Sequence, residues 1–265
     1  MYNIIKAQTY QMVRQNRTYY IILGGVGFMF LQLLFMAADG GVTEMSGSYF
    51  AFSAGGALPI FPCFVCLLMT VGICGGDLGD RTMNYEILSG SKRTEVFFGR
   101  VVLSVFWSFL GYLLMLSLPA AAVGLISGWG KLMTVRGFMS RLFLQLIPLF
   151  RYICIIAALT FLTLDTMAPT VIGFVIVLAE AAGSMVISEF SADSTLLSCL
   201  LTVYQGICFY DISNVGIEYI GGEDVMVVKE MLDKSTVLIS SAASLGVSAA
   251  VLMAGCLIFK DKDLK

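Results

Sequence analysis

Two ionisable residues stand inside apolar stretches of this chain and are its first candidates for chemistry. Arg151 lies within residues 142–164 and Glu180 lies within residues 170–187. A charge at the middle of a membrane-spanning helix costs about 2.5–3.5 kcal/mol, so such residues usually face the inside of a helix bundle and pair. Three interpretations are open for Arg151 and Glu180: an ion pair that stabilises the bundle, the lining of a translocation path, and a proton-coupled transport site.

The spacing of the two residues supports a pair. Arg151 lies 14 residues before Asp165, and Glu180 lies 11 residues after Pro169. Residues 165–169 read as a tight turn between two helices, with Pro169 suited to a helix start. At about 1.5 Å of rise per residue, the two charges would lie within a few ångströms of the same depth. An Arg151–Glu180 ion pair is therefore geometrically possible.

The residue types that the chain lacks exclude several kinds of chemistry. It contains no histidine, which removes the usual general base and the commonest metal ligand. Ser–His, Cys–His and HExxH catalysis are excluded with it. No GxxxxGK[ST] motif is present for binding ATP through a phosphate loop. We therefore expect no enzyme, and no metal or other cofactor on this chain; the net charge of −2 gives no indication of nucleic acid as a partner.

Cysteines offer one short motif. Cys63-x-x-Cys66 has the spacing of a redox or metal site. Within a helix the same spacing only places two small apolar residues on one face, and this is the interpretation that we favour. Cys199 and Cys208 would be able to form a disulfide in an oxidising compartment, and the sequence leaves that open.

The composition of the chain predicts the kind of secondary structure that holds these residues. Hydrophobic residues make up 58% of the chain and charged residues only 13%, against about 25% charged in soluble domains. The sequence therefore predicts an all-α integral membrane protein. A helix lying in the membrane interface is expected at residues 1–17, where apolar residues recur at helical spacing. The expected transmembrane domain, 18–259, has six spans: 18–38, 57–75, 97–126, 142–164, 170–187 and 235–259.

Two polar connections and a tail complete the expected layout. Residues 75–100 form a basic elbow, 188–234 form a long outer connection, and 260–265 form a charged tail. The first part of the outer connection, 195–210, is apolar enough for a short re-entrant helix. Six spans place both termini on one side, together with the elbow. That side carries the larger number of basic residues, so the positive-inside rule predicts that it is cytoplasmic. The ten basic residues on it are Lys6, Arg14, Arg17, Arg81, Lys92, Arg93, Arg100, Lys260, Lys262 and Lys265, and the five on the other side are Lys131, Arg136, Arg141, Lys229 and Lys234.

The order of these elements resembles the permease subunits of ABC transporters of the type 2 exporter family. In that family the elbow between spans two and three forms a coupling helix with an acidic residue, a glycine and basic residues, followed by an apolar run into span three. Those places are held here by Glu86, Gly90 and Lys92/Arg93, with Arg100 at the head of the span. Residues 259–261, Phe-Lys-Asp, match the basic-acidic pair with which the last span of the family tends to end.

The resemblance implies a membrane exporter with several partners. Two permeases, identical or homologous, would pair in a bacterial cytoplasmic membrane and bind two ABC ATPase subunits, with ATP and Mg on the ATPases. The cargo would be an antimicrobial peptide such as a lantibiotic, or a hydrophobic small molecule. The residues implied in ATPase contact are Arg81, Glu86, Gly90, Lys92 and Arg93. Two other functions stay open: an ion- or proton-coupled secondary transporter that uses Arg151 and Glu180, and a non-catalytic membrane scaffold.

Overall fold

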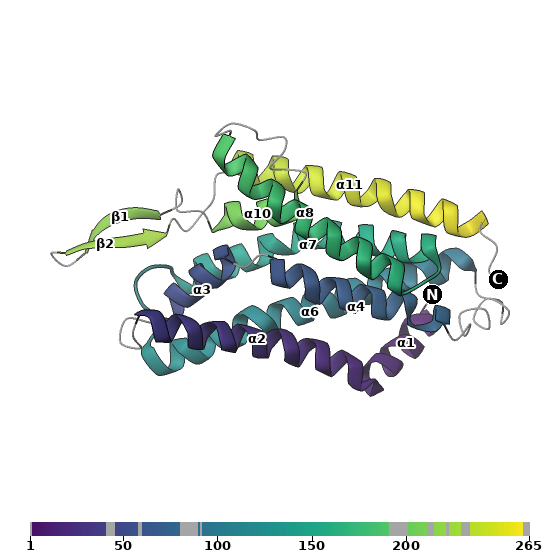
Figure 1. The fold of residues 1–265 in the computed structure, drawn as a ribbon, viewed down its shortest axis with the longest axis horizontal. Helices are drawn as coiled ribbons and strands as arrows, with labels where there is room; N and C mark the ends of the chain where they lie inside the picture. Colours follow the sequence, from purple (N-terminus) through teal and green to yellow (C-terminus); the bar gives the residue numbers. More distant parts are fainter. Residues whose placement is uncertain are drawn as a thin grey trace.

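The protein is an elongated helical bundle whose two termini lie at the same end (Figure 1). The computed structural model describes residues 2–40, 46–57, 60–79, 90, 92–190, 201–210, 215–220, 223–228 and 234–261. Within these ranges, five helices are long and apolar enough to cross a membrane, or six if one bent pair counts as a single span. The prediction of an all-α, multi-pass membrane protein is confirmed.

The elements follow one another without a large sheet. In the described ranges the helices are α1 (Tyr2–Arg14), α2 (Asn16–Gly40), α3 (Gly47–Ala57), α4 (Ile60–Gly79), α6 (Arg93–Ser127), α7 (Val135–Thr163), α8 (Met167–Phe190), α10 (Thr202–Phe209) and α11 (Lys234–Asp261). Strands β1 (Val215–Ile220) and β2 (Glu223–Val228) form one antiparallel hairpin, with Val215 opposite Val228 and Ile220 opposite Glu223.

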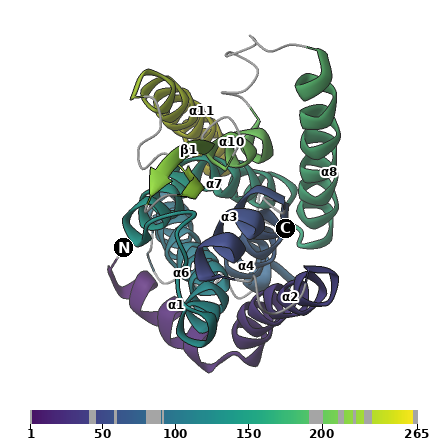
Figure 2. The same ribbon diagram turned by 90° about the vertical axis from the view of Figure 1, so that its left-hand side faces the viewer.

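Helices α4, α6 and α7 form the inside of the bundle, and α2, α8 and α11 lie around them (Figure 2). In the most apolar 18-residue stretch of α7, 56% is buried within the protein. In the corresponding stretch of α2, only 11% is buried. Large apolar side chains of α2, including Leu23, Leu34 and Phe35, are exposed. Such a surface is unfavourable in water, but it is expected where a helix faces the hydrocarbon of a bilayer.

The second span differs from the single straight span predicted for residues 57–75. It is a bent pair, because residues 47–57 also form a helix, α3, which meets α4 at an angle of 70°. Residues 39–56 lie between two predicted spans, yet Phe50 within them is fully buried. Small residues explain the close packing: a Cβ atom added at Gly47 would lie 2.9 Å from Cα of Gly124 in α6.

The turn between α7 and α8 is defined by local hydrogen bonds. Leu164 adopts the left-handed conformation, with φ of 54°, and its N–H donates to the carbonyl of Thr160. The carboxylate of Asp165 then accepts from the N–H groups of Thr166, Met167 and Ala168 at the start of α8. At its other end, α7 starts at Val135, so Arg136 and Arg141 lie within the helix rather than in the outer loop.

The outer connection 188–234 contains more structure than the sequence predicts. The short helix expected within 195–210 is present as α10, and residues 195–200 lie outside the described ranges. The hairpin was not predicted. Its last residue, Val228, donates its N–H to the carbonyl of Leu132 at 2.7 Å, which joins the hairpin to the loop between α6 and α7.

Candidate functional site

Arg151 and Glu180, the two charges predicted to pair, come together at the start of α10. Arg151 is 1% exposed, and its Nη2 donates to Oγ1 of Thr202 at 3.0 Å. The Oε2 atom of Glu180 accepts from the backbone N–H of Val203 at 3.1 Å, and Glu180 also bonds to Thr202. Thr202 therefore bridges the guanidinium and the carboxylate, which also attract each other directly as opposite charges.

Glu180 supplies the N-terminal cap that α10 lacks. The first N–H groups of a helix have no partner within the helix, and a capping side chain usually satisfies one of them. The N-cap residue here is Leu201, which has no side-chain acceptor. The carboxylate of Glu180 takes this place from α8, and its negative charge suits the positive end of the α10 dipole. The contact is thus both a hydrogen bond and a favourable charge–dipole interaction.

Arg141 binds the opposite end of α10. Its Nε donates to the carbonyl of Phe209, the last residue of the helix, at 2.8 Å. Its Nη1 also donates to the carbonyl of Gly137 one turn earlier in α7, at 3.3 Å. Arg141 is 1% exposed, and a cation at this place suits the negative end of the helix dipole. Both ends of α10 are therefore held by charged side chains from the surrounding helices.

The sides of α10 are also packed against the bundle. It contacts α7, α8 and α3, and Oγ of Ser244 in α11 donates to Oε1 of Gln205 at 3.2 Å. The ring of Tyr210 fills the space next to Gly55 of α3, where an added Cβ would overlap it. Helix α10 is accordingly a structural centre that joins four helices of the bundle.

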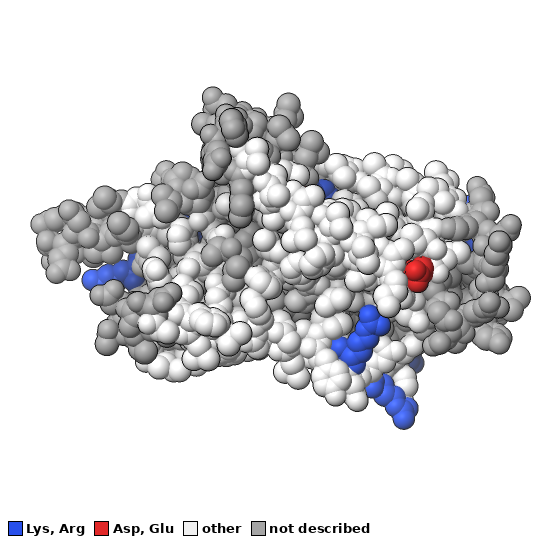
Figure 3. All heavy atoms as spheres, in the orientation of Figure 1, with Lys and Arg blue, Asp and Glu red and all other residues white. Residues whose placement is uncertain are grey.

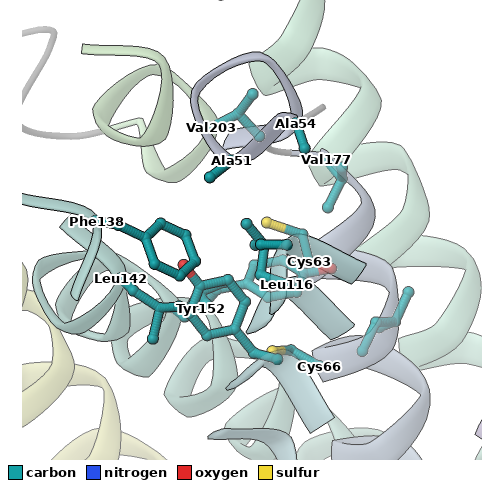
Figure 4. Close-up of a cluster of buried hydrophobic side chains, with 14 of the residues drawn as sticks. Ala51, Ala54, Cys63, Cys66, Leu116, Phe138, Leu142, Tyr152, Val177 and Val203 are labelled. Atoms are coloured by element: carbon teal, nitrogen blue, oxygen red, sulfur yellow. The ribbon is translucent and has the colours of Figure 1, made fainter. Parts of the chain in front are cut away.

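An apolar core lies directly below α10. Val203 of α10 and Ala51 and Ala54 of α3 face Leu116 and Tyr152 (Figure 4). Cys63 and Cys66 belong to the same core and are almost fully buried, in line with the interpretation that this motif packs as small apolar residues. In the ranges that the structure describes, no group of His, Cys, Asp or Glu side chains is arranged to hold a metal ion.

The basic elbow, the second predicted site, is described only at its two ends. Arg81 and Glu86 lie outside the described residues, and their contact with an ATPase stays a prediction. Gly90 has a φ of 97°, a conformation that favours glycine, and Lys92 is the exposed N-cap of α6. The Nη1 atom of Arg93 donates to the carbonyl of Lys260 in the last turn of α11, at 3.1 Å. At the C-terminal part of the elbow, the start of α6 is therefore in contact with α11.

Arg100 lies deeper than its predicted place at the head of the span. It is fully buried within α6, and its Nη1 donates to the carbonyl of Cys74 in α4 at 3.4 Å. At the preceding residue, Gly99, an added Cβ would lie 3.3 Å from Ile4 of α1. The first turns of α6 thus contact α1, α4 and α11 together.

Sequence reasoning missed Arg141, Thr202 and Gln205. Arg141 was assigned to an outer loop, because the apolar run of α7 begins only after it. A usable signal was the helical spacing of Arg141, Gln145 and Tyr152, which are all buried on α7. Thr202 and Gln205 carry no comparable signal, because their partners Arg151 and Ser244 are 51 and 39 residues away in the chain.

Comparison with known proteins finds no protein family model that matches this chain and no match among curated protein sequences. The functional argument therefore depends on the geometry of the bundle and on the order of its elements.

Proposed function

We propose that this protein is the permease subunit of an ATP-driven exporter of the ABC type 2 kind. The observation that carries the proposal is the set of contacts at the start of α6. This helix follows the elbow directly and is bonded to α11 through Arg93 and to α4 through Arg100, while α1 packs beside it. A force applied to the elbow would therefore act on four elements together.

Helix α6 is suited to carry such a force across the membrane. Its 35 residues give a length of about 52 Å, well beyond the roughly 30 Å of bilayer hydrocarbon. Near its far end, Gly124 contacts Gly47 of α3 and the ring of Trp129. Pro119 lies inside α6, but the helix runs without interruption from Arg93 to Ser127, and such an element between two packed ends can carry coupling. Movement of the elbow would reach α3, and through α3 it would reach α10.

The remaining parts of the proposal follow the family resemblance. Two copies of the permease, identical or homologous, would pair and bind two ATPase subunits, which hold ATP and Mg. The ATPases would contact the elbow at Arg81, Glu86, Gly90, Lys92 and Arg93, on the cytoplasmic face of a bacterial membrane. The cargo would be a peptide or a hydrophobic small molecule, and this chain would hydrolyse no ATP itself.

The geometry around Glu180 speaks for an anchoring role and against the alternative of a proton- or ion-coupled transporter. A transport carboxylate has to release its partners during each cycle. Glu180 instead receives the N–H of Val203 and lies beside Arg151, which is bonded to the same turn of α10. Release of this carboxylate would leave the start of α10 without its cap.

Co-purification tests the proposal. The tagged chain is extracted from its native membranes in mild detergent, and the eluate is assayed for ATP hydrolysis. We expect a stoichiometric ATPase partner that is lost with the double substitution Glu86→Ala/Arg93→Ala. The matched control is Arg14→Ala, which removes an exposed arginine of α1 outside the elbow. An eluate without ATPase, from protein that is folded and extracted under several mild detergents, would contradict the proposal.

A further inference from the structure

A groove of about 540 Å³ runs between α2 and α4, with Met115 of α6 at its base. This volume lies within the range of small-molecule sites in proteins. Its walls are apolar and partly aromatic, and Phe28 of α2 stacks on Phe61 of α4 with 3.9 Å between the ring centroids. The missing side chain of Gly24 helps to create the space, since no described atom lies within 4 Å of a Cβ added there.

The length of the groove matches one leaflet of a bilayer. It extends along α2 from Arg17 to Phe28, which are eleven residues apart. At about 1.5 Å per residue this is about 16 Å, close to half of the roughly 30 Å of bilayer hydrocarbon. The groove is also next to lipid, because α2 is the least buried of the candidate spans. Its dimensions and position therefore fit one acyl chain.

Arg17 places a positive charge at one end of this groove. It is exposed, and its guanidinium packs over Gly72 of α4, where an added Cβ would lie 3.6 Å from Cζ. Within the described part of the chain, no hydrogen-bond or ion-pair partner of Arg17 is present. The residue lies in the first turn of α2, where the helix dipole adds to its positive potential.

Further cations lie on α1, the helix that precedes α2 in the chain. Lys6 and Arg14 of α1 are exposed, and positively charged side chains gather over the junction of α1 and α2 (Figure 3). The hydroxyl-bearing residue Tyr20 also lines the groove and is 70% exposed. A polar, cationic end joined to an apolar channel is complementary to a molecule with an anionic head and a hydrocarbon chain.

We propose that this groove binds an anionic phospholipid, with one acyl chain between α2 and α4 and its phosphate on Arg17. A guanidinium binds phosphate through charge-assisted hydrogen bonds, while the aromatic walls contact the chain. The bound lipid would join α2, otherwise weakly packed, to the inside of the bundle. The inference stands apart from ATP-driven export, because it concerns the surface between α2 and α4 and none of the predicted ATPase-contact residues.

Native mass spectrometry of the detergent-purified chain tests this inference. The protein is incubated with phosphatidylglycerol and, separately, with phosphatidylcholine of the same acyl chains. We expect preferential retention of phosphatidylglycerol by the wild type. Arg17→Ala should weaken this retention by about tenfold or more, because a hydrogen-bonded charge contact is lost. Gly24→Leu should weaken it similarly by filling the groove.

Two matched variants serve as controls. Arg136→Ala removes an exposed charge of α7, a helix that does not line the groove. Gly27→Leu adds the same side chain to α2 outside the groove, where no described atom lies within 4 Å of an added Cβ. Both should retain phosphatidylglycerol as the wild type does, and a thermal unfolding scan verifies that all four variants are folded. Equal retention of the two lipids by the wild type, or equal retention by all variants, would overturn the inference. A loss of dimer mass in Gly24→Leu without loss of lipid would also overturn it, since a second copy would then occupy the groove.

Discussion

At each end of the bundle, an arginine donates a hydrogen bond to a carbonyl in the last turn of a helix, but the two arginines differ greatly in burial. At the end that holds α10, Arg141 donates to the last carbonyl of a helix and is 1% exposed. At the end that holds the termini, Arg93 donates to a carbonyl in the last turn of α11 from a partly exposed position. Hydrogen bonds of buried charged groups contribute about 1.5–3 kcal/mol, whereas exposed charge contacts contribute about 0–1 kcal/mol.

This difference indicates which contacts break first when the molecule moves. Helix α10 is held by the buried Arg141 at one end and by the buried Arg151 and the partly buried Glu180 at the other, so its displacement would leave a buried arginine without these partners. The contact of Arg93 exchanges for water at little cost. We therefore expect the Arg93 contact to break first under an applied force, while the contacts of α10 stay intact and α10 moves with the helices around it. Four predictions test this comparison.

The largest effect is expected at Arg151. Arg151→Leu should lower the free energy of unfolding by about 3–5 kcal/mol, because the carboxylate of Glu180 would stay in the interior without its opposite charge. Thermal unfolding of the detergent-purified chain, followed by the fluorescence of Trp107 and Trp129, measures the loss.

Two double variants identify the cause of that loss. Arg151→Leu/Glu180→Gln should recover part of the stability, since it removes the remaining buried charge. The charge swap Arg151→Glu/Glu180→Arg should not recover it, because an arginine at position 180 is unable to accept the N–H of Val203. Full recovery by the swap would show that the attraction between the two charges matters and the contact with α10 does not.

The second prediction compares the two arginines directly. Arg141→Met should lower the free energy of unfolding by about 2 kcal/mol, since it leaves the carbonyl of Phe209 unsatisfied in the interior. Arg93→Met, its exposed counterpart, should lower it by less than about 1 kcal/mol. Alkylation of Cys208 in α10, located by peptide mass spectrometry, should become faster in Arg141→Met alone. Equal losses in the two variants would remove the distinction between the ends.

A third prediction concerns the packing of α10 on α3. Gly55→Ala should destabilise the protein by about 1–3 kcal/mol, because the added methyl group would overlap the ring of Tyr210. The same substitution at Gly246 of α11, where no described atom lies within 4 Å, should be neutral or stabilise the helix by up to about 1 kcal/mol. Thermal unfolding separates the two, and a loss of equal size at both sites would contradict the packing argument.

The smallest effect is expected at Asp165, at the exposed turn between α7 and α8. The N–H groups of Met167, Thr166 and Ala168 hold the pKa of its carboxyl below the usual range. Its contribution to stability is therefore complete above the ordinary aspartate pKa of about 4, and it is lost as the pH falls through the lowered value. Asp165→Asn keeps a capping oxygen at neutral pH but should flatten the acid branch of a plot of melting temperature against pH. Parallel curves for the two proteins would contradict this.

The five long apolar helices in the described ranges were predictable as spans, because the length of an apolar run is a local property of the sequence. The bent pair of α3 and α4 was not predictable, because the Gly/Ser-rich residues before Ala57 do not form a long apolar run. They form a helix because glycine allows α3 to approach α6, as at Gly47 and Gly124. The hairpin likewise depends on a distant contact, the bond between Val228 and Leu132. The predicted ATPase-contact residues Arg81 and Glu86 lie in a part of the elbow outside the described ranges.

By itself, the sequence determined that Arg151 and Glu180 lie within apolar segments and would need partners. Charges inside apolar helices are costly in any arrangement, so that conclusion did not require the fold. Only the tertiary structure decided that these partners include the first turn of α10, and that Arg141 holds the last. Hydrogen bonds depend on positions within a few tenths of an ångström, and those positions are set by packing between segments far apart in the chain.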